Sequence, residues 1–231
     1  MSFDGSLTRR AVKTLKNTGH SVEISDLYAE DFDPLERVQH YKNRIETKRF
    51  DILSEQRHAY KTGTFPKDVQ REIQRLEKCD LLILQFPLWW HQQPAILKSW
   101  FDRVFVGGGL YTSKMRYDKG YFKGKSAICS VTSGAPKSTF TASGRGGGEI
   151  EALLKSINFS LHYMGFTVLS PYLSAEIQNK DFTYMSPEKF KLHITESLAK
   201  WEKHLENIQN IRPLTFPGWN DGDENGVEKK A

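Results

Sequence analysis

The stretch LLILQFPLWWHQQPAILKSWFDRVF, residues 81–105, changes from one hydrophobic pattern to another. The run from Leu81 to Phe86 places apolar side chains on both faces of an extended chain, as a strand covered by helices on both sides requires. From Pro94, a residue suited to the first turn of a helix, apolar residues follow a helical pattern to Val106. The glycines at 107–109 end that pattern. The stretch therefore predicts a buried strand followed by a helix.

The same alternation continues through the rest of the chain. Strands are expected over 21–27 (SVEISDL), 125–132 (KSAICSVT) and 166–173 (FTVLSPYL). Helices are expected over 7–18, 67–80, 149–164 and 186–208, whereas residues 28–65 are charged, helix-like and outside the simple alternation. Alternating strands and helices predict an α/β fold, a three-layer sandwich around a parallel sheet.

The domain organisation predicted from composition is simple. No internal repeat and no linker divides the chain, so residues 1–217 are expected to form one domain. Residues 218–231 are polar and Gly-rich and are expected to be a disordered tail.

Composition excludes several classes of protein. Hydrophobic residues make up 38% and charged residues 26% of the 231 positions, as in soluble globular proteins. Lys and Arg are scattered despite a net charge of +5, which argues against nucleic-acid binding and favours anionic small ligands. The sequence shows no signal peptide and no apolar run near the roughly 20 residues of a membrane helix. Cys79 and Cys129 form neither a metal spacing nor a disulfide framework, so a cytoplasmic location is expected.

Two loops of unusual composition follow predicted strands. Ligands of parallel sheets bind at the carboxyl ends of strands, where PLWWHQQP (87–94) and TSGAPKSTF (132–140) are expected. A flat tricyclic ligand needs a floor, aromatic edges and amides that bond its carbonyls and ring nitrogens. The first loop offers indole edges and backbone N–H groups, and the small residues Gly134 and Ala135 allow close approach of the main chain. Paired tryptophans such as Trp89 and Trp90 are also common in cores and interfaces.

Other chemistry in these loops is poorly supported. His91 has no second His, Cys or acid at a metal-ligand spacing, so no metal site is expected. Ser133 lies outside a G-x-S-x-G elbow and has no identifiable Asp and His partners. The segment 143–149 (SGRGGGE) lacks the Lys and Ser/Thr of a phosphate-binding P-loop, and a flexible loop over a pocket is the preferred interpretation.

Several motifs, in this order and spacing, give a specific resemblance. QFPLWW, PAILKSWFDRVF, LYTSKMRYDKG and SVTSG, together with SDLYAEDFDP and the late KWEKHLENI, resemble the NAD(P)H:quinone oxidoreductase family. These are the DT-diaphorase-like flavoproteins of the flavodoxin-like fold, and the resemblance extends to about Phe216. It implies NAD(P)H as donor, a quinone as acceptor, ping-pong hydride transfer through flavin N5, and a homodimer. The charged insertion after Tyr28 favours FAD over FMN.

The resemblance also implies roles for particular positions. The flavin ring would contact Pro87, Leu88, Trp89, Trp90 and His91, while Thr132, Ser133, Gly134 and Ala135 would hold its pyrimidine and ribityl side. Ser2, Phe3 and Asp4 would lie on the phosphate side, and Phe140 would pack near the cofactor. Leu110, Tyr111 and Thr112 would face the nicotinamide or quinone across the dimer interface.

Two departures from the family pattern concern catalysis. The family carries a Tyr and a His in the loop that follows its TTGG motif, which corresponds to TSGA (132–135) in this sequence. The matching positions here are Phe140 and Gly146. Neither can move a proton, although backbone donors also stabilise a flavin anion. His91 stands where the family has an aromatic residue. We hypothesise that His91 partly compensates.

A third departure concerns the N-terminus. The family has a first strand and a His-x-x-x-x-Ser-Phe-Asn loop before its first helix, and Ser2, Phe3 and Asp4 match only the end of that loop. Either the native protein begins roughly fifteen residues upstream, or this form is compromised. Asp4 stands where the family has Asn, and its carboxylate is unfavourable beside a pyrophosphate unless it points away, for example to cap the helix.

Two further functions remain open. Some relatives act as ancillary subunits of potassium-efflux transporters, so a flavin-binding regulatory module is the main alternative. The other alternative is a truncated, flavin-free chain that performs neither role.

Overall fold

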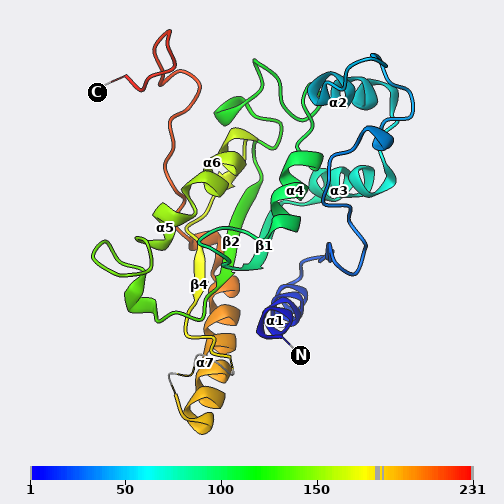
Figure 1. Ribbon diagram of the computed structural model, residues 1–231. Helices are drawn as coiled ribbons and strands as arrows, with labels where there is room; N and C mark the ends of the chain where they lie inside the picture. Colours follow the sequence, from blue (N-terminus) through cyan, green and yellow to red (C-terminus); the bar gives the residue numbers. More distant parts are fainter. Residues whose placement is uncertain (1, 180–182, 184, 230–231) are drawn as a thin grey trace.

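A parallel sheet of short strands lies at the centre of the computed structural model, which describes residues 2–179, 183 and 185–229 (Figure 1). Strand β2 is central, with β1 on one side and β3 and β4 on the other. The strands are β1 (Leu81–Pro87), β2 (Ser126–Thr132), β3 (Thr167–Val168) and β4 (Tyr172–Ser174). The helices are α1 (Phe3–Asn17), α2 (Ile52–Thr62), α3 (Lys67–Lys78), α4 (Ala95–Val104), α5 (Ile150–Leu153), α6 (Lys155–Tyr163) and α7 (Pro187–Glu206). Short 3-10 turns span Val38–His40, Tyr117–Lys119, Lys137–Thr139 and Ile208–Asn210.

Alternate residues of β1 face two different helical layers. Leu84 and Phe86 belong to the main core, which also contains apolar residues of α3, α4 and α6. Ile83, on the opposite face, packs in a smaller cluster formed by α1 and α7 around Trp201. Helices therefore cover both faces of the sheet. The predicted three-layer α/β sandwich with a parallel sheet is confirmed.

Most predicted elements form, with shifted ends. The helix after Pro94 is α4, and the expected helix over 149–164 is divided into α5 and α6 at Leu154. The expected strand over 166–173 is also divided, into β3 and β4. Between them, Ser170 donates its N–H to the carbonyl of Arg212, so the returning chain after α7 occupies part of this edge. That bond lies on the outer edge of β3, whereas the ladder to β2 stops at Pro171, which has no N–H to donate.

The strand predicted over 21–27 is wrong. Residues 20–26 form no regular structure, and Ile24 is 47% exposed. Among the described strands, β1 pairs only with β2, and α1 begins at Phe3 with no described strand before it. Without a neighbouring strand, the segment has no ladder to join. Its polar side chains instead bind Arg75 of α3, through Glu23, Ser25 and Glu30.

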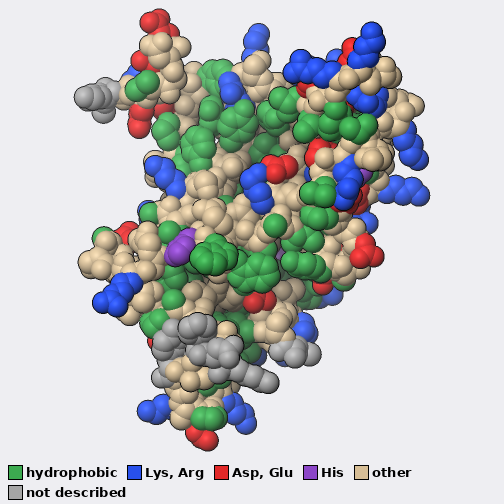
Figure 2. Space-filling view, viewed as in Figure 1, with side chains coloured by type: hydrophobic (Ala, Val, Ile, Leu, Met, Phe, Trp, Pro, Cys, Tyr) green, Lys and Arg blue, Asp and Glu red, His purple; other side chains and the backbone are tan. Residues whose placement is uncertain are grey.

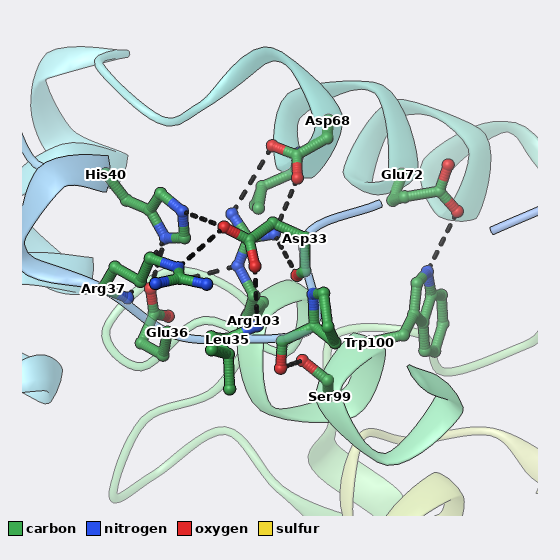
Figure 3. A network of polar contacts seen from close by, with 12 residues as sticks. Asp33, Leu35, Glu36, Arg37, His40, Asp68, Glu72, Ser99, Trp100 and Arg103 are labelled. Atoms are coloured by element: carbon green, nitrogen blue, oxygen red, sulfur yellow. Dashed lines mark hydrogen bonds and ion pairs between the residues drawn. The ribbon is translucent and has the colours of Figure 1, made fainter. Parts of the chain in front are cut away.

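Arg103 of α4 connects the charged excursion to the core (Figure 3). Its side chain is 1% exposed, and Nη1 donates to Asp68 Oδ2 at 2.6 Å and to the carbonyl of Asp33 at 2.8 Å. The guanidinium also lies 4.9 Å from the ring centroid of Phe32. Because this charge is removed from water, its partners must stay in place. Residues 32–34 are thereby fixed against α3 and α4.

His40 closes the same network from the other side. Its Nε2 lies 3.1 Å from Asp33 Oδ2, and its Nδ1 lies 3.1 Å from Glu36 Oε1. The N–H of Leu35 also donates to Asp33, and this bond is the main reason that the pKa of the Asp33 carboxyl lies below its usual value; the His40 ring lowers it further. The helix-like character predicted for residues 28–65 is therefore confirmed in α2 and the turn Val38–His40, while the rest of the excursion is an irregular segment held by polar contacts.

Substitution of Arg103 tests this anchor. We expect Arg103→Ala to lower the free energy of unfolding by about 3–5 kcal/mol, because it leaves Asp68 without its buried partner. Lys98→Ala on the same helix removes the exposed Lys98–Asp102 pair, which should change stability by less than about 1 kcal/mol. Urea denaturation of both variants measures the difference. Equal effects would contradict an anchoring role for Arg103.

His204 of α7 makes stability depend on pH. Its ring lies 4.7 Å from that of Tyr172 and 5.7 Å from that of Trp201, and burial lowers its pKa. Its Nε2 is buried without a hydrogen-bond partner in the described chain. A lowered pKa in the folded state means that the unfolded chain binds the proton more readily.

The free energy of unfolding should therefore fall as the pH drops below about 6.5, the unfolded pKa of histidine. His204→Phe keeps a ring against Trp201 and removes the titrating group. We expect its stability to depend less on pH between 7 and 5 than that of the unsubstituted chain, measured by urea denaturation at each pH. Parallel curves for the two proteins would refute the assignment.

Candidate functional site

The carboxyl ends of β1 and β2 meet side by side. Pro87 is in register with Thr132, and the N–H of Leu88 donates to the Thr132 carbonyl at 2.8 Å. The loops that begin at Leu88 and Ser133 therefore start from adjacent points on one edge of the sheet, where ligands of parallel sheets bind. The two loops that the sequence predicted as a site are brought together here.

The WWH segment forms a two-residue hairpin. Trp89 and Gln92 exchange both backbone hydrogen bonds, each 3.0 Å long. Trp90 and His91 have φ angles of 51° and 63°, the left-handed conformation that a type I′ turn requires and that Asn and Gly usually supply. Bulky residues in this region carry strain of about 1–3 kcal/mol each. Such strain is concentrated at functional sites.

This turn presents aromatic surface to solvent. Trp89 is 55% exposed and Trp90 94% exposed, and neither contributes to the core. In Figure 2, apolar side chains and a histidine gather near the middle of the face, over the region where Figure 1 draws the loop after β1. A core role for the tryptophans is therefore excluded in this chain, and a contact with a ligand or a partner is favoured.

Among the residues that the family resemblance places at the flavin ring, three backbone donors remain available. Within the described chain, the N–H groups of Trp90, His91 and Gly134 form no hydrogen bond. The neighbouring amides are used: Ser133 donates to the carbonyl of Ser174, and Ala135 to the hydroxyl of Ser133. Of the amides predicted to bind a flat ligand, three are therefore free to do so: those of Trp90 and His91 in the loop after β1, and that of Gly134 in the loop after β2.

The glycines after Phe140 allow no side chain at position 146. A Cβ added at Gly146 would lie 2.7 Å from the Thr139 carbonyl oxygen and 3.0 Å from the Phe140 ring, and the Gly146 N–H donates to that same carbonyl. Phe140 is buried beneath this loop. A Cβ on Gly147 would lie 3.3 Å from His91, so the glycine-rich loop lies directly against the WWH turn.

Asp4 lies at the same edge but does not cap α1. The hydroxyl of Ser2 caps the helix by accepting from the Gly5 N–H at 3.1 Å. The Asp4 carboxylate accepts hydrogen bonds from the Thr132 hydroxyl at 3.0 Å and from Gln85 Nε2 at 3.2 Å. The Asp4 carboxylate is therefore held by the sheet edge, and capping of α1, one way in which it could have been directed, is performed by Ser2. Phe3 packs against the cluster of Leu7, Trp201 and Leu205.

Sequence reasoning missed the cluster of Asp4, Gln85 and Thr132. A signal was present, because Gln85 is the polar residue within the otherwise apolar run LLILQF. A polar side chain in a buried strand needs a partner, and that partner comes from α1.

Leu110, Tyr111 and Thr112 lie at the other end of the sheet. Tyr111 contacts Tyr163 at the end of α6, close to where β2 and β3 begin (Figure 1). The seven-residue strand β2 runs from this region to Thr132, and its six residue steps correspond to about 20 Å. Leu110 is fully buried in the core, whereas Tyr111 and Thr112 line a cavity of about 340 Å³. One chain does not bring these residues to the WWH turn.

A larger hollow of about 990 Å³ lies between Arg116, Tyr117, Phe159 and the segment 217–229. It contains no residue of the loops after β1 and β2. Within the described residues, no group of three or more His, Cys, Asp or Glu side chains is placed to hold a metal ion. None of the helices described is long and apolar enough to cross a membrane.

Comparison with known proteins agrees with this geometry. A family model described as flavodoxin-like fold matches residues 1–205. NAD(P)H dehydrogenase [quinone] 1 of Cavia porcellus is 38% identical over 216 residues, 93% of this chain and 75% of the relative. Ribosyldihydronicotinamide dehydrogenase [quinone] of Mus musculus is 34% identical over 222 residues, 94% of this chain and 91% of the relative.

Solved structures give the same result. A putative quinone reductase from Klebsiella pneumoniae superposes with a TM-score of 0.83 at 29% identity, covering 96% of this chain and 85% of that one. The resemblance found in the sequence motifs is therefore confirmed over most of the chain. The protein belongs to the NAD(P)H:quinone oxidoreductase family, within the flavodoxin-like fold.

Proposed function

We propose that this chain is an enzyme, an FAD-dependent NAD(P)H:quinone oxidoreductase that acts in the cytoplasm. The observation that carries the proposal is the set of three unused amides at Trp90, His91 and Gly134, beside exposed indole rings at the end of β1 and β2. Carbonyl groups and ring nitrogens of a flavin match such donors, and the flat ring matches the aromatic surface. FAD rather than FMN remains our proposal from the charged excursion over residues 28–65.

The protein would contribute orientation and electrostatics, while a bound flavin supplies two-electron hydride chemistry. In this proposal Trp90, His91 and Gly134 hold the ring by their main chain, Pro87, Leu88 and Trp89 lie along it, and Thr132, Ser133 and Ala135 hold the adjoining side. Donor and quinone would use one site in turn, a ping-pong scheme. Phe140 and Gly146 transfer no proton, which leaves the amides and His91 as polar groups beside the ring.

A homodimer follows from the same proposal. Tyr111 and Thr112 lie about 20 Å from Thr132 along β2, so they reach the flavin ring only if they come from a second copy. Two identical sites, each built from both copies, would satisfy the isologous symmetry typical of dimers.

Asp4 lies at the start of α1, where the helix dipole favours a phosphate and the carboxylate opposes it. Asp4→Asn keeps an acceptor for Thr132 and removes the charge. We therefore expect about fivefold tighter binding of FAD, from the roughly 1 kcal/mol typical of such charges. Asp80→Asn, at the amino end of β1, is the matched control and should leave the Kd unchanged. Fluorescence titration with FAD measures both, and equal affinities would count against a phosphate near α1.

Purified protein tests the activity itself. We expect a yellow preparation that releases FAD on denaturation and oxidises NAD(P)H with menadione without any partner protein. Double-reciprocal plots at several menadione concentrations should give parallel lines. Flavin-loaded protein with negligible turnover would instead favour the regulatory module, and a colourless preparation would favour the flavin-free form.

His91 carries the side chain in the turn whose ring nitrogens can both donate and accept hydrogen bonds. If it assists the reaction, His91→Phe should lower quinone turnover by about tenfold to a hundredfold and change the profile between pH 5 and 8. His20→Phe, at an exposed position after α1, is the control. Unchanged turnover of His91→Phe across this range would exclude a role for the imidazole.

A further inference from the structure

The cavity at the amino end of the sheet contains a cation with no partner. Arg57 of α2 lines this cavity of about 340 Å³, together with Leu53, Gly107, Gly108, Tyr111, Thr112, Ser113 and Tyr163. Within the described chain its guanidinium forms no hydrogen bond and no ion pair, and none of the lining residues is acidic. The cavity therefore has one uncompensated positive charge. We call it the Arg57 pocket.

The glycine turn after α4 shapes this pocket. A Cβ on Gly108 would lie 2.6 Å from Cγ and 2.8 Å from Nε of Arg57, and the φ of Gly108 is +80°. The arginine stem therefore lies directly over bare backbone. A Cβ on Gly109 would likewise lie 2.4 Å from the Tyr60 ring. The three glycines at 107–109 thus do more than end α4: they let α2 place a guanidinium against the Tyr111 loop.

Hydroxyl groups complete the polar lining. The hydroxyls of Tyr111 and Ser113 form no hydrogen bond within the described residues, and Tyr111 Oη lies 3.3 Å from the Cβ position of Gly107. Burial raises the pKa of Tyr111, so its hydroxyl keeps the proton at neutral pH and donates. A guanidinium with two hydroxyl donors is a combination suited to oxyanions.

The remaining walls are apolar or aromatic. Leu53 lies on one side, and the Tyr163 ring, 5.7 Å from that of Tyr111, lies on another. Tyr163 is held in place from behind, because Arg116 donates to its hydroxyl at 3.3 Å and lies over its ring. The pocket can therefore hold a planar group next to the anion it binds.

We propose that the Arg57 pocket binds an anionic group, a phosphate or a sulfonate or carboxylate, carried by one of the two reactants. The inference rests on the proposed function, because Tyr111 and Thr112 reach the flavin of a second copy only in the proposed dimer. It adds a specificity determinant to that site. The phosphate would belong to the nicotinamide donor, and the sulfonate or carboxylate to the quinone acceptor.

Kinetics of flavin-loaded full-length protein distinguish these two sources. Donors are NADPH and NADH; acceptors are 1,2-naphthoquinone-4-sulfonate and uncharged 1,2-naphthoquinone. Arg57→Gln should raise the KM of one reactant about tenfold, either NADPH or the sulfonated quinone, as loss of a charged hydrogen bond predicts. The KM of its counterpart, NADH without the 2′-phosphate or the quinone without the sulfonate, should stay within about twofold. A change confined to NADPH identifies the donor phosphate, and a change confined to the sulfonate identifies the acceptor.

Two control variants distinguish loss of the Arg57 guanidinium from a general loss of positive charge on α2. Lys61→Gln removes one positive charge from the exposed surface of α2, one turn away and outside the pocket, and should leave all four KM values unchanged. Arg57→Lys keeps the charge and should recover part of the loss. If Arg57→Gln and Lys61→Gln behave alike, the pocket does not bind the anion, although quinone turnover would still support the proposed function.

A binding measurement tests the anion-binding pocket independently of the proposed enzyme activity. Calorimetric titration of unsubstituted and Arg57→Gln protein with NADP⁺ and with naphthalene-2-sulfonate needs no turnover. Weaker binding of either probe to the variant supports the pocket even if the enzyme proves inactive. Equal binding of both probes to both proteins, or no binding to either, overturns the inference.

Discussion

Parallel pairing of β1 with β2 is the constraint on which the rest of the molecule depends. Seven residue pairs in register, from Leu81 and Ser126 to Pro87 and Thr132, place the two strand ends at one edge. The same register aligns Leu84 with Cys129 and Phe86 with Val131, so one face of the sheet is continuous for α3, α4 and α6. The site loops and the core are thus positioned by a single ladder.

A second constraint is the burial of Arg103. A guanidinium inside a protein is costly unless its charge is paired, and here Nη1 of Arg103 binds Asp68 and the Asp33 carbonyl, which lie far apart in the sequence. Residues 28–65 contain too little apolar surface to fold by themselves, yet they contribute Asp33 and Phe32 to this buried charge. The network thus orders a segment that hydrophobic burial alone would leave loose.

The sequence predicted those elements whose pattern is local. The buried run at β1, the helix after Pro94 and the late helix from Ser186 each carry their own period and end signals, and each forms. The segment 21–27 carries a strand period as well, but a strand also needs a neighbour, and periodicity does not report one. The division of the strand expected over 166–173 has a local cause, because Pro171 has no N–H with which to continue the ladder to β2.

The candidate site was predictable to the level of loops but not of atoms. Paired tryptophans in a loop after one strand and small residues in a loop after another suggested a flat ligand. Which amides stay free depends instead on bonds such as that between Ser133 and Ser174. The position of Asp4 depends likewise on Gln85 and Thr132. Arg57 carries no motif at all. Its place in the pocket depends on the absence of a side chain at Gly108, which only the folded chain places beneath it.

The left-handed turn at Trp90 and His91 assigns ligand binding to main-chain groups and leaves the chemical character of the site to the side chains. Its free N–H groups belong to the main chain, so any residue that tolerates the turn would offer the same donors. Side chains at these positions can therefore change without removing the hydrogen bonds that would hold a ligand. Such a turn is a natural point of divergence between relatives: the ligand is retained by the backbone, while the chemistry around it is set by whichever side chains the turn displays.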